Sequence, residues 1–199
     1  ILREFGVPAT FFVSTGYIDS GASYAYDWLV HLFHRSGASR VVIPELRVDT
    51  SMPPDRCERA ALAERVLDRI KALPEIQQAA IIGRLEDEWS IPRKPHADSR
   101  PMNWGQLREM HAAGMEIGSH GVHHWMLAQL PHDEMAAELA GSRSTLEREL
   151  ESPAQVISYP VGGPDAYNDA EIAAARAPNV ASCGSFGRRR HALSMVDPF

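Results

Sequence analysis

The order of predicted elements in the middle of the chain constrains its fold most. Residues 103–113 are typical of a short helix, because Asn103 can act as the N-cap with Gln106 three residues later. Gly114 fits the left-handed position that ends a helix, and Met115–Ser119 is then a predicted strand. A helix, a glycine stop, a strand and a polar loop in succession indicate an α/β fold, whose functional sites lie at the carboxyl ends of parallel strands.

Apolar segments on both sides extend this pattern. The sequence predicts three parallel strands of one sheet, over residues 11–13, 115–117 and 156–158. We expect helices over 103–113 and 132–151 to pack outside this sheet, because parallel strands need a crossover that is long enough for a helix. The longer helix has an apolar stripe at Met135, Leu139, Leu146 and Leu150.

A cluster of histidines follows the middle strand, in the run Gly118-Ser119-His120-Gly121-Val122-His123-His124. Two imidazoles four residues apart can lie on one face of a turn and bind one metal ion through neutral nitrogens. The spacing alone is weak support in a chain with nine histidines, and surface or capping histidines are the competing interpretation. The position at a strand end favours the metal site. We therefore predict that His120 and His124 are ligands and that His123 points away.

A second candidate binding segment lies where the last predicted strand ends. Residues 155–158 run into the turn Tyr159-Pro160-Val161-Gly162. Glycine lets the backbone approach a ligand closely, so such a turn can direct backbone N–H groups at a bound molecule. An ordinary tight turn explains the segment equally well when it is considered alone.

Taken together, these segments resemble the polysaccharide deacetylase family, the metal-dependent carbohydrate esterases that include chitin and peptidoglycan deacetylases. Gly6–Val13 is similar to the family's second strand, and Trp104–Leu130 contains its metal motif of His, Ser or Thr, two variable residues and His. Tyr159–Gly162 is similar to the proline-containing loop that lines one side of the family's groove. The resemblance implies an incomplete, distorted (β/α) barrel in which residues 1–199 form one domain with a helical insertion over 20–100.

The resemblance also implies the chemistry. The metal motif falls on His120 and His124. The residues on the substrate and oxyanion side are Tyr159, Pro160 and Val161, with the backbone N–H of Val161 as the oxyanion donor. The expected ion is Zn²⁺, and Co²⁺, Ni²⁺ and Fe²⁺ also suit an open site of two His and one carboxylate. The implied activity is that of a metal-dependent hydrolase that removes N-acetyl groups from amino sugars of a polysaccharide or glycan.

Two alternatives stay open at this point. One is a catalytically inactive, glycan-binding relative that keeps the fold and the groove. The other is a relative that hydrolyses another amide, such as a cyclic imide or ureide. The catalytic aspartates distinguish the first alternative from the deacetylase, and the ligand pocket distinguishes the second.

The chain departs from the family pattern. Gly121 stands where the family has Ser or Thr, whose hydroxyl helps to hold the metal-binding loop, so a looser loop is expected. The family's Asp-Asp motif supplies the catalytic base and the third metal ligand, and it precedes the Pro-Ala-Thr-Phe-Phe strand. We therefore expect both aspartates upstream of Ile1 and interpret the chain as an internal fragment that is inactive by itself. For the family's late catalytic His the candidate is His191, where a basic loop beside Arg188–Arg190 is the simpler interpretation.

Residues 20–100 are poorly covered by the resemblance and are predicted to be mostly helical. The expected elements are helices around Tyr24–Phe33, Leu62–Leu73 and Ile76–Trp89 and a short strand over Arg40–Leu46. His31 and His34 fall on the first of these helices and are expected at its surface rather than at a metal. A cap that shapes substrate choice and a purely structural extension are both compatible with this insertion.

Composition excludes several classes of function. The net charge of −6 argues against nucleic acid as the main partner, because phosphate backbones are bound by clustered Lys and Arg. No apolar run approaches the ~20 residues of a membrane-spanning helix. Cys57 and Cys183 match no metal or redox spacing. These features fit a globular enzyme with an N-acetylated glycan as its partner, and they leave the oligomeric state and the compartment open.

Overall fold

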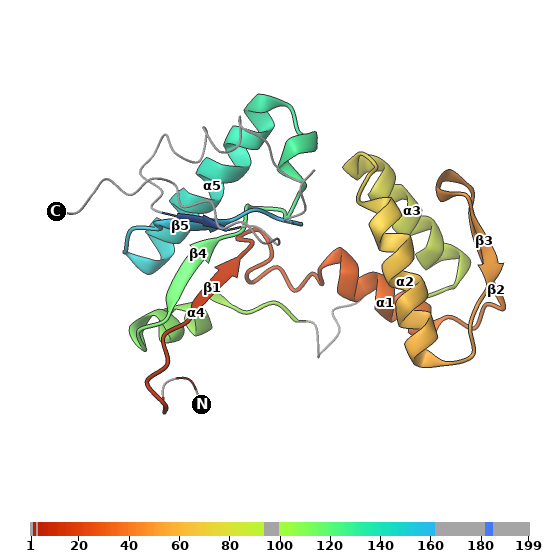
Figure 1. Ribbon diagram of the computed structural model, residues 1–199, viewed down its shortest axis with the longest axis horizontal. Coiled ribbons are helices and arrows are strands. Elements are labelled where there is room, and N and C mark those ends of the chain that lie inside the picture. The colour runs from red at the N-terminus through yellow and green to blue at the C-terminus, as the bar shows by residue number, and fades with distance from the viewer. Residues whose placement is uncertain (1, 3, 94–99, 162–181, 185–199) are drawn as a thin grey trace. The chain divides into compact units, whose positions relative to one another are not determined.

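A computed structural model describes residues 2, 4–93, 100–161 and 182–184 of the chain. The chain divides into two compact units (Figure 1). Unit 1 comprises Ile1–Ser20 together with Pro101–Phe199, and unit 2 comprises Gly21–Arg100. Unit 2 therefore interrupts unit 1 in the sequence. In the described parts of both units, every helix is too short or too polar to cross a membrane.

Unit 1 is built on a four-stranded parallel sheet. Its strands are β1 (Thr10–Val13), β4 (Glu116–Ser119), β5 (Val156–Ser158) and β6 (Ser182–Gly184), in the order β1-β4-β5-β6. Thr10 pairs with Glu116 and Ser119 pairs with Ile157, and all neighbouring strands are parallel. The α/β class and the three predicted parallel strands are therefore confirmed. β6 is a fourth strand that the sequence analysis did not predict.

This sheet is open within the described residues. β1 pairs with β4 and forms one edge, and β6 pairs with β5 and forms the other. The described part of the chain thus contains no closed barrel, and the barrel implied by the family resemblance stays a prediction.

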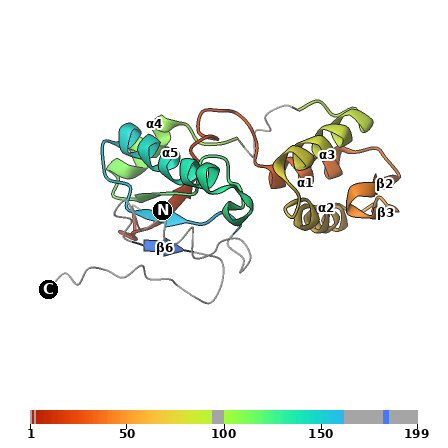
Figure 2. The same cartoon turned by 90° about the horizontal axis from the view of Figure 1, so that it is seen from above.

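Two helices, α4 (Trp104–Ala112) and α5 (His132–Leu150), pack on one face of the sheet (Figure 2). They confirm the helices predicted for these segments to within a residue at each end. The helices share a core with strands β1 and β4, whose buried residues are Val13, Leu107, Ile117, Leu146 and Ala154. This core covers one face of the sheet. The loops that carry the candidate site follow the carboxyl ends of the strands.

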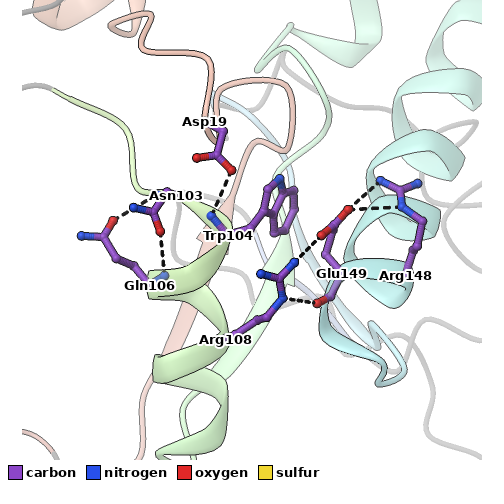
Figure 3. A network of polar contacts seen from close by, with 7 residues as sticks. All are labelled: Asp19, Asn103, Trp104, Gln106, Arg108, Arg148 and Glu149. Atoms are coloured by element: carbon purple, nitrogen blue, oxygen red, sulfur yellow. Dashed lines mark hydrogen bonds and ion pairs between the residues drawn. The ribbon is translucent and has the colours of Figure 1, made fainter.

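A polar network joins α4 to α5 and to the segment that follows β1 (Figure 3). The Arg108 guanidinium donates to the Glu149 carboxylate at 2.6 Å and to the Glu149 carbonyl oxygen at 3.0 Å. At the start of α4, the Trp104 N–H donates to the Asp19 carboxylate at 3.3 Å. Since Arg108 is exposed, its ion pair with Glu149 adds little free energy.

The N-terminus of α4 carries the predicted capping box. The Asn103 side chain accepts from the Gln106 N–H at 2.9 Å, and the Gln106 side chain accepts from the Asn103 N–H at 3.0 Å. Asn103→Ala removes the first bond, so we expect the free energy of unfolding of unit 1 to fall by about 1 kcal/mol. Urea denaturation measures this change, and the exposed Glu109→Ala on the same helix is the control, expected within about 0.5 kcal/mol of the parent. Equal stabilities of the two variants would contradict a role for the cap.

Unit 2 has a core of its own. Its elements are α1 (Ala25–Arg35), β2 (Arg40–Ile43), the 3₁₀ turn η1 (Pro44–Leu46), β3 (Val48–Ser51), α2 (Arg56–Ile70) and α3 (Glu75–Glu88). Buried apolar residues from the three helices and both strands form one cluster, in which Leu29, Leu32 and Phe33 are fully buried. The three helices predicted for this part of the chain are confirmed.

The structure corrects the single strand expected over Arg40–Leu46. β2 ends at Ile43, η1 turns the chain, and β3 returns antiparallel to β2. Pro44 has no N–H to continue the ladder, and Arg47 completes the turn with a left-handed φ of 51°. β3 reads Val-Asp-Thr-Ser and has one apolar residue, so its pattern carries little strand signal.

The two histidines of α1 make structural contacts. The His31 ring stacks on Trp28 with the ring centroids 5.0 Å apart. The His34 Nε2 atom lies 3.0 Å from the Arg56 carbonyl oxygen, which joins α1 to the start of α2. These contacts give both side chains a role in the packing of unit 2.

Candidate functional site

The predicted metal-binding loop begins directly at the carboxyl end of β4. The His120 N–H donates at 2.9 Å to the carbonyl oxygen of the last β1 residue, Val13, and so continues the strand pairing by one residue. The segment after β1 then holds the loop, because the Thr15 N–H donates to the Gly121 oxygen at 3.1 Å. The loop is therefore fixed to the sheet through its backbone.

Gly16 allows a close approach between this segment and the loop. The Gly16 N–H donates to the Val122 carbonyl oxygen at 2.9 Å. A Cβ atom on residue 16 would lie 2.8 Å from the same oxygen, which is closer than a real side chain approaches a backbone atom. Gly16 was not among the residues predicted from the sequence, although a glycine just after a strand can signal a close backbone approach.

The partly buried imidazole of His120 makes a hydrogen bond to the neighbouring strand β5. Its Nδ1 atom lies 2.7 Å from the Ser158 carbonyl oxygen at the end of β5. A carbonyl oxygen only accepts, so this contact assigns the proton to Nδ1 and the lone pair to Nε2. Burial lowers the pKa of His120, and the bond to Ser158 opposes this shift only in part. The ring is therefore neutral at pH 7, in the form that binds metal ions.

The His124 ring lies next to that of His120. Their ring centroids are 4.7 Å apart, and the ring planes cross at 65°. Two imidazoles that share one tetrahedral Zn²⁺ ion place their centroids about 5 Å apart, given Zn–N bonds of about 2.0–2.1 Å. His124 also has a left-handed φ of 63°, a conformation that a non-glycine residue keeps only where its surroundings enforce it. The donor types and the ring separation fit a shared divalent ion.

His123 is directed at a different partner. Its Nδ1 atom lies 2.5 Å from the Oε1 atom of Glu138 in α5. Its ring stacks on Trp125 with the centroids 4.4 Å apart. Both contacts agree with the expectation that His123 turns away from the other two histidines.

Glu138 is a second residue at this site that was not predicted from the sequence. Its side chain is 4% exposed, and its Oε2 atom accepts from the Val122 and His123 N–H groups, both at 2.9 Å. A signal for it is present in the sequence. Glu138 lies inside the apolar stripe of α5, between Met135 and Leu139, and a charged residue at a buried position of such a stripe needs a partner.

The turn after β5 lies beside the histidine loop. Tyr159 and Pro160 are buried. A Cβ atom on Gly121 would lie 3.7 Å from the Pro160 Cγ atom, which places the proline against the loop. Together with the contact between His120 and Ser158, this brings the two segments that were predicted separately to the same end of the sheet.

Val161 follows with a backbone conformation that β-branched residues rarely adopt. Its φ of 66° lies in the left-handed region. Such a conformation costs about 1–3 kcal/mol and persists where the surrounding structure fixes it, as at ligand-binding sites. This strained residue is the one whose backbone N–H the family resemblance assigns to the oxyanion.

Some predicted residues lie outside the described part of the chain. These are Gly162, His191 and Arg188–Arg190. Within the described part, no three side chains of His, Cys, Asp or Glu are grouped so that they could hold a metal ion. His120 and His124 are thus two candidate ligands, and a third is not assigned there.

A comparison with known protein families shows which family the chain belongs to. The family model for polysaccharide deacetylases matches residues 1–180. The chain belongs to the polysaccharide deacetylase family. No curated protein matches it.

Two solved deacetylase structures are similar to this member of the polysaccharide deacetylase family. The Streptococcus pyogenes deacetylase PplD in complex with acetate is 28% identical, with a TM-score of 0.39, over 42% of this chain and 36% of that chain. A de-N-acetylase from Aggregatibacter actinomycetemcomitans is 15% identical, with a TM-score of 0.39, over 92% of this chain and 87% of that chain. The chain thus spans about a third of the length of the streptococcal protein.

Gly121 is the position at which the sequence departs from the motif predicted for this loop. The residue has a left-handed φ of 75°, and a Cβ atom there would lie 3.1 Å from the Glu138 Oε2 atom. Ser or Thr would therefore be strained in this loop conformation. The Ser119 hydroxyl instead accepts from the Gly121 N–H at 3.3 Å and donates to the Ser142 hydroxyl at 2.8 Å. The loop is thus held by Ser119 and Glu138 instead of by a side chain at position 121.

Proposed function

We propose that this protein is a metal-dependent hydrolase that removes N-acetyl groups from amino sugars of a glycan. The observation that carries the proposal is the pair of imidazoles at the end of β4, His120 and His124, whose centroids are 4.7 Å apart. The bond from His120 Nδ1 to the Ser158 carbonyl supports it, because it fixes the tautomer that offers Nε2 to a metal ion. Membership of the polysaccharide deacetylase family supports the reaction type.

The proposed ion is Zn²⁺, with Co²⁺, Ni²⁺ or Fe²⁺ as alternatives. His120 and His124 would hold it, together with an aspartate of the family's Asp-Asp motif. Two neutral His and one carboxylate form the ligand set of many zinc hydrolases and leave a coordination position open. When bound, such an ion polarises the acetamide carbonyl and lowers the pKa of a water molecule.

The residues of the chain would then orient the substrate and stabilise the negative charge that develops on it during the reaction. We propose that Tyr159 and Pro160 form the buried support of the turn on the substrate side. The Val161 N–H would donate to the tetrahedral oxyanion, a contact that is typically worth about 10²–10³ in rate. In the family, this activity goes with a distorted (β/α) barrel, of which the parallel sheet of unit 1 would form part.

Acetate release tests this function. We expect the full-length protein, loaded with Zn²⁺ or Co²⁺, to release acetate from N-acetylglucosamine oligomers. Removal of the ion with a chelator should abolish the release, and adding the ion back should restore it. Hydrolysis of a cyclic imide or ureide without acetate release would instead favour another amide substrate. Glycan binding without hydrolysis of any substrate would favour an inactive binding relative.

A further inference from the structure

The Glu138 carboxylate makes three hydrogen bonds, and all three come from the loop between the proposed metal ligands. Its Oε2 atom accepts from the N–H groups of Val122 and His123, each at 2.9 Å. Its Oε1 atom lies 2.5 Å from the Nδ1 atom of the His123 ring. Consecutive backbone N–H groups that converge on one anion form a concave binding site, here filled by a side chain of the protein itself.

The three hydrogen bonds compensate for the burial of the Glu138 carboxylate. Glu138 is 4% exposed, and burying a carboxylate is unfavourable unless hydrogen-bond donors replace the lost water. Here the donors belong to the loop that follows β4 and precedes α5. Hydrogen bonds to a charged acceptor are stronger than bonds between neutral groups. The carboxylate and the loop therefore order each other.

The part of the loop that is ordered in this way lies directly between His120 and His124. Gly121 and His124 both have left-handed backbones, with φ of 75° and 63°. A non-glycine residue stays in that region only when its surroundings over-determine it. Glu138 binds the two residues that separate these positions, so it fixes the path by which the His124 ring reaches the His120 ring.

We propose that Glu138 is a positioning residue for the metal site. Its buried carboxylate holds Val122 and His123 so that the two flanking histidines converge on one ion. The inference rests on the proposed function, because it assigns Glu138 to the same metal site. A carboxylate that merely stabilises the fold would change stability but leave the metal affinity of the folded protein unaltered.

Binding of Co²⁺ to the full-length protein tests the proposal, with Glu138→Gln as the main variant. Gln keeps the shape of the side chain but presents an N–H₂ group in place of one acceptor oxygen. We expect the Co²⁺ affinity to fall by about 10- to 100-fold and the visible Co²⁺ spectrum of the folded protein to change. In the metal-free protein, we expect faster hydrogen exchange at the Val122 and His123 amides.

Two further variants make the result decisive. Glu134→Gln is the matched control, because Glu134 is an exposed glutamate one turn earlier in α5, and it should leave affinity and spectrum unchanged. Gly121→Ala disturbs the same contact from the loop side, since its Cβ atom would press on the Glu138 Oε2 atom. Gly121→Ala should weaken Co²⁺ binding as well. If Glu138→Gln fails to fold, the Co²⁺ affinity of Gly121→Ala tests the proposal in its place.

The outcomes separate this inference from the proposed function. A Co²⁺ affinity within about twofold of the parent in Glu138→Gln, or in Gly121→Ala if the first variant does not fold, would overturn the positioning role and leave the metal site intact. Co²⁺ binding that persists unchanged in His120→Ala would overturn the proposed metal site and the positioning role together.

Discussion

Replacing His120 with Ala is expected to weaken Zn²⁺ binding by the full-length protein more than about 100-fold. Partners that only orient a ligand are typically worth about 10- to 100-fold in metal affinity, so the loss of a ligand itself costs more. The 2.7 Å contact from His120 Nδ1 to the Ser158 oxygen fixes the ring with its lone pair on Nε2, and Ala removes that donor. The same loss is expected for His124→Ala. Competition with a chromophoric chelator measures both affinities.

Two other histidines provide the controls for this experiment. His132→Ala changes an exposed histidine at the start of α5 and should leave the affinity unchanged. His123→Ala removes one of the three bonds to Glu138 and should keep the affinity within about 10-fold of the parent. If His120→Ala binds Zn²⁺ as tightly as His132→Ala does, the ligand set lies elsewhere.

The ligand variants are also expected to abolish catalysis. In the full-length, Zn²⁺-loaded protein, His120→Ala and His124→Ala should reduce acetate release from N-acetylglucosamine oligomers to background, because the ion that activates water is no longer held. Val161→Ala should keep the rate of acetate release within about 10-fold of the parent. The contact proposed for Val161 comes from its backbone N–H, which this substitution keeps. The rate of acetate release at saturating metal measures all three.

Comparing the rates of Val161→Ala and of the two histidine variants shows whether a backbone group or a side chain contributes to catalysis at each position. Loss of activity in Val161→Ala as complete as in His120→Ala would contradict the backbone contact and assign the role to the valine side chain. Activity of the ligand variants above background would contradict the metal assignment. The exposed His132→Ala again serves as the control and should keep the parent rate.

Much of unit 1 follows from local signals in the sequence. The capping box of Asn103 and Gln106 starts α4 at the predicted residue, and Gly114 follows its end with a left-handed φ of 85°. The alternation from helix to strand predicts the parallel pairing of β1, β4 and β5, which is present. The caps and the apolar periodicity of each element depend on residues within a few positions of one another, so they can be recognised without a partner from elsewhere in the chain.

The features that were not predicted from the sequence depend on partners outside their own segment. β3 carries mostly polar residues and is a strand because β2 supplies its hydrogen bonds. Glu138 looks like an interruption of the apolar stripe of α5 until the loop after β4 supplies its donors. Gly16 is ordinary in sequence, and its importance comes from the Val122 oxygen that approaches it.

The same division applies to the candidate site. The sequence by itself determined which residues are suitable as ligands, His120 and His124, and the position of that motif at the end of a strand. Only the tertiary structure decided the proton position on His120, the direction of His123 and the meeting of the loop with the turn at Pro160. The physical reason is that helix caps and periodicity act between neighbours, whereas tautomers, buried charges and close backbone contacts are fixed by groups that folding brings together from distant parts of the chain.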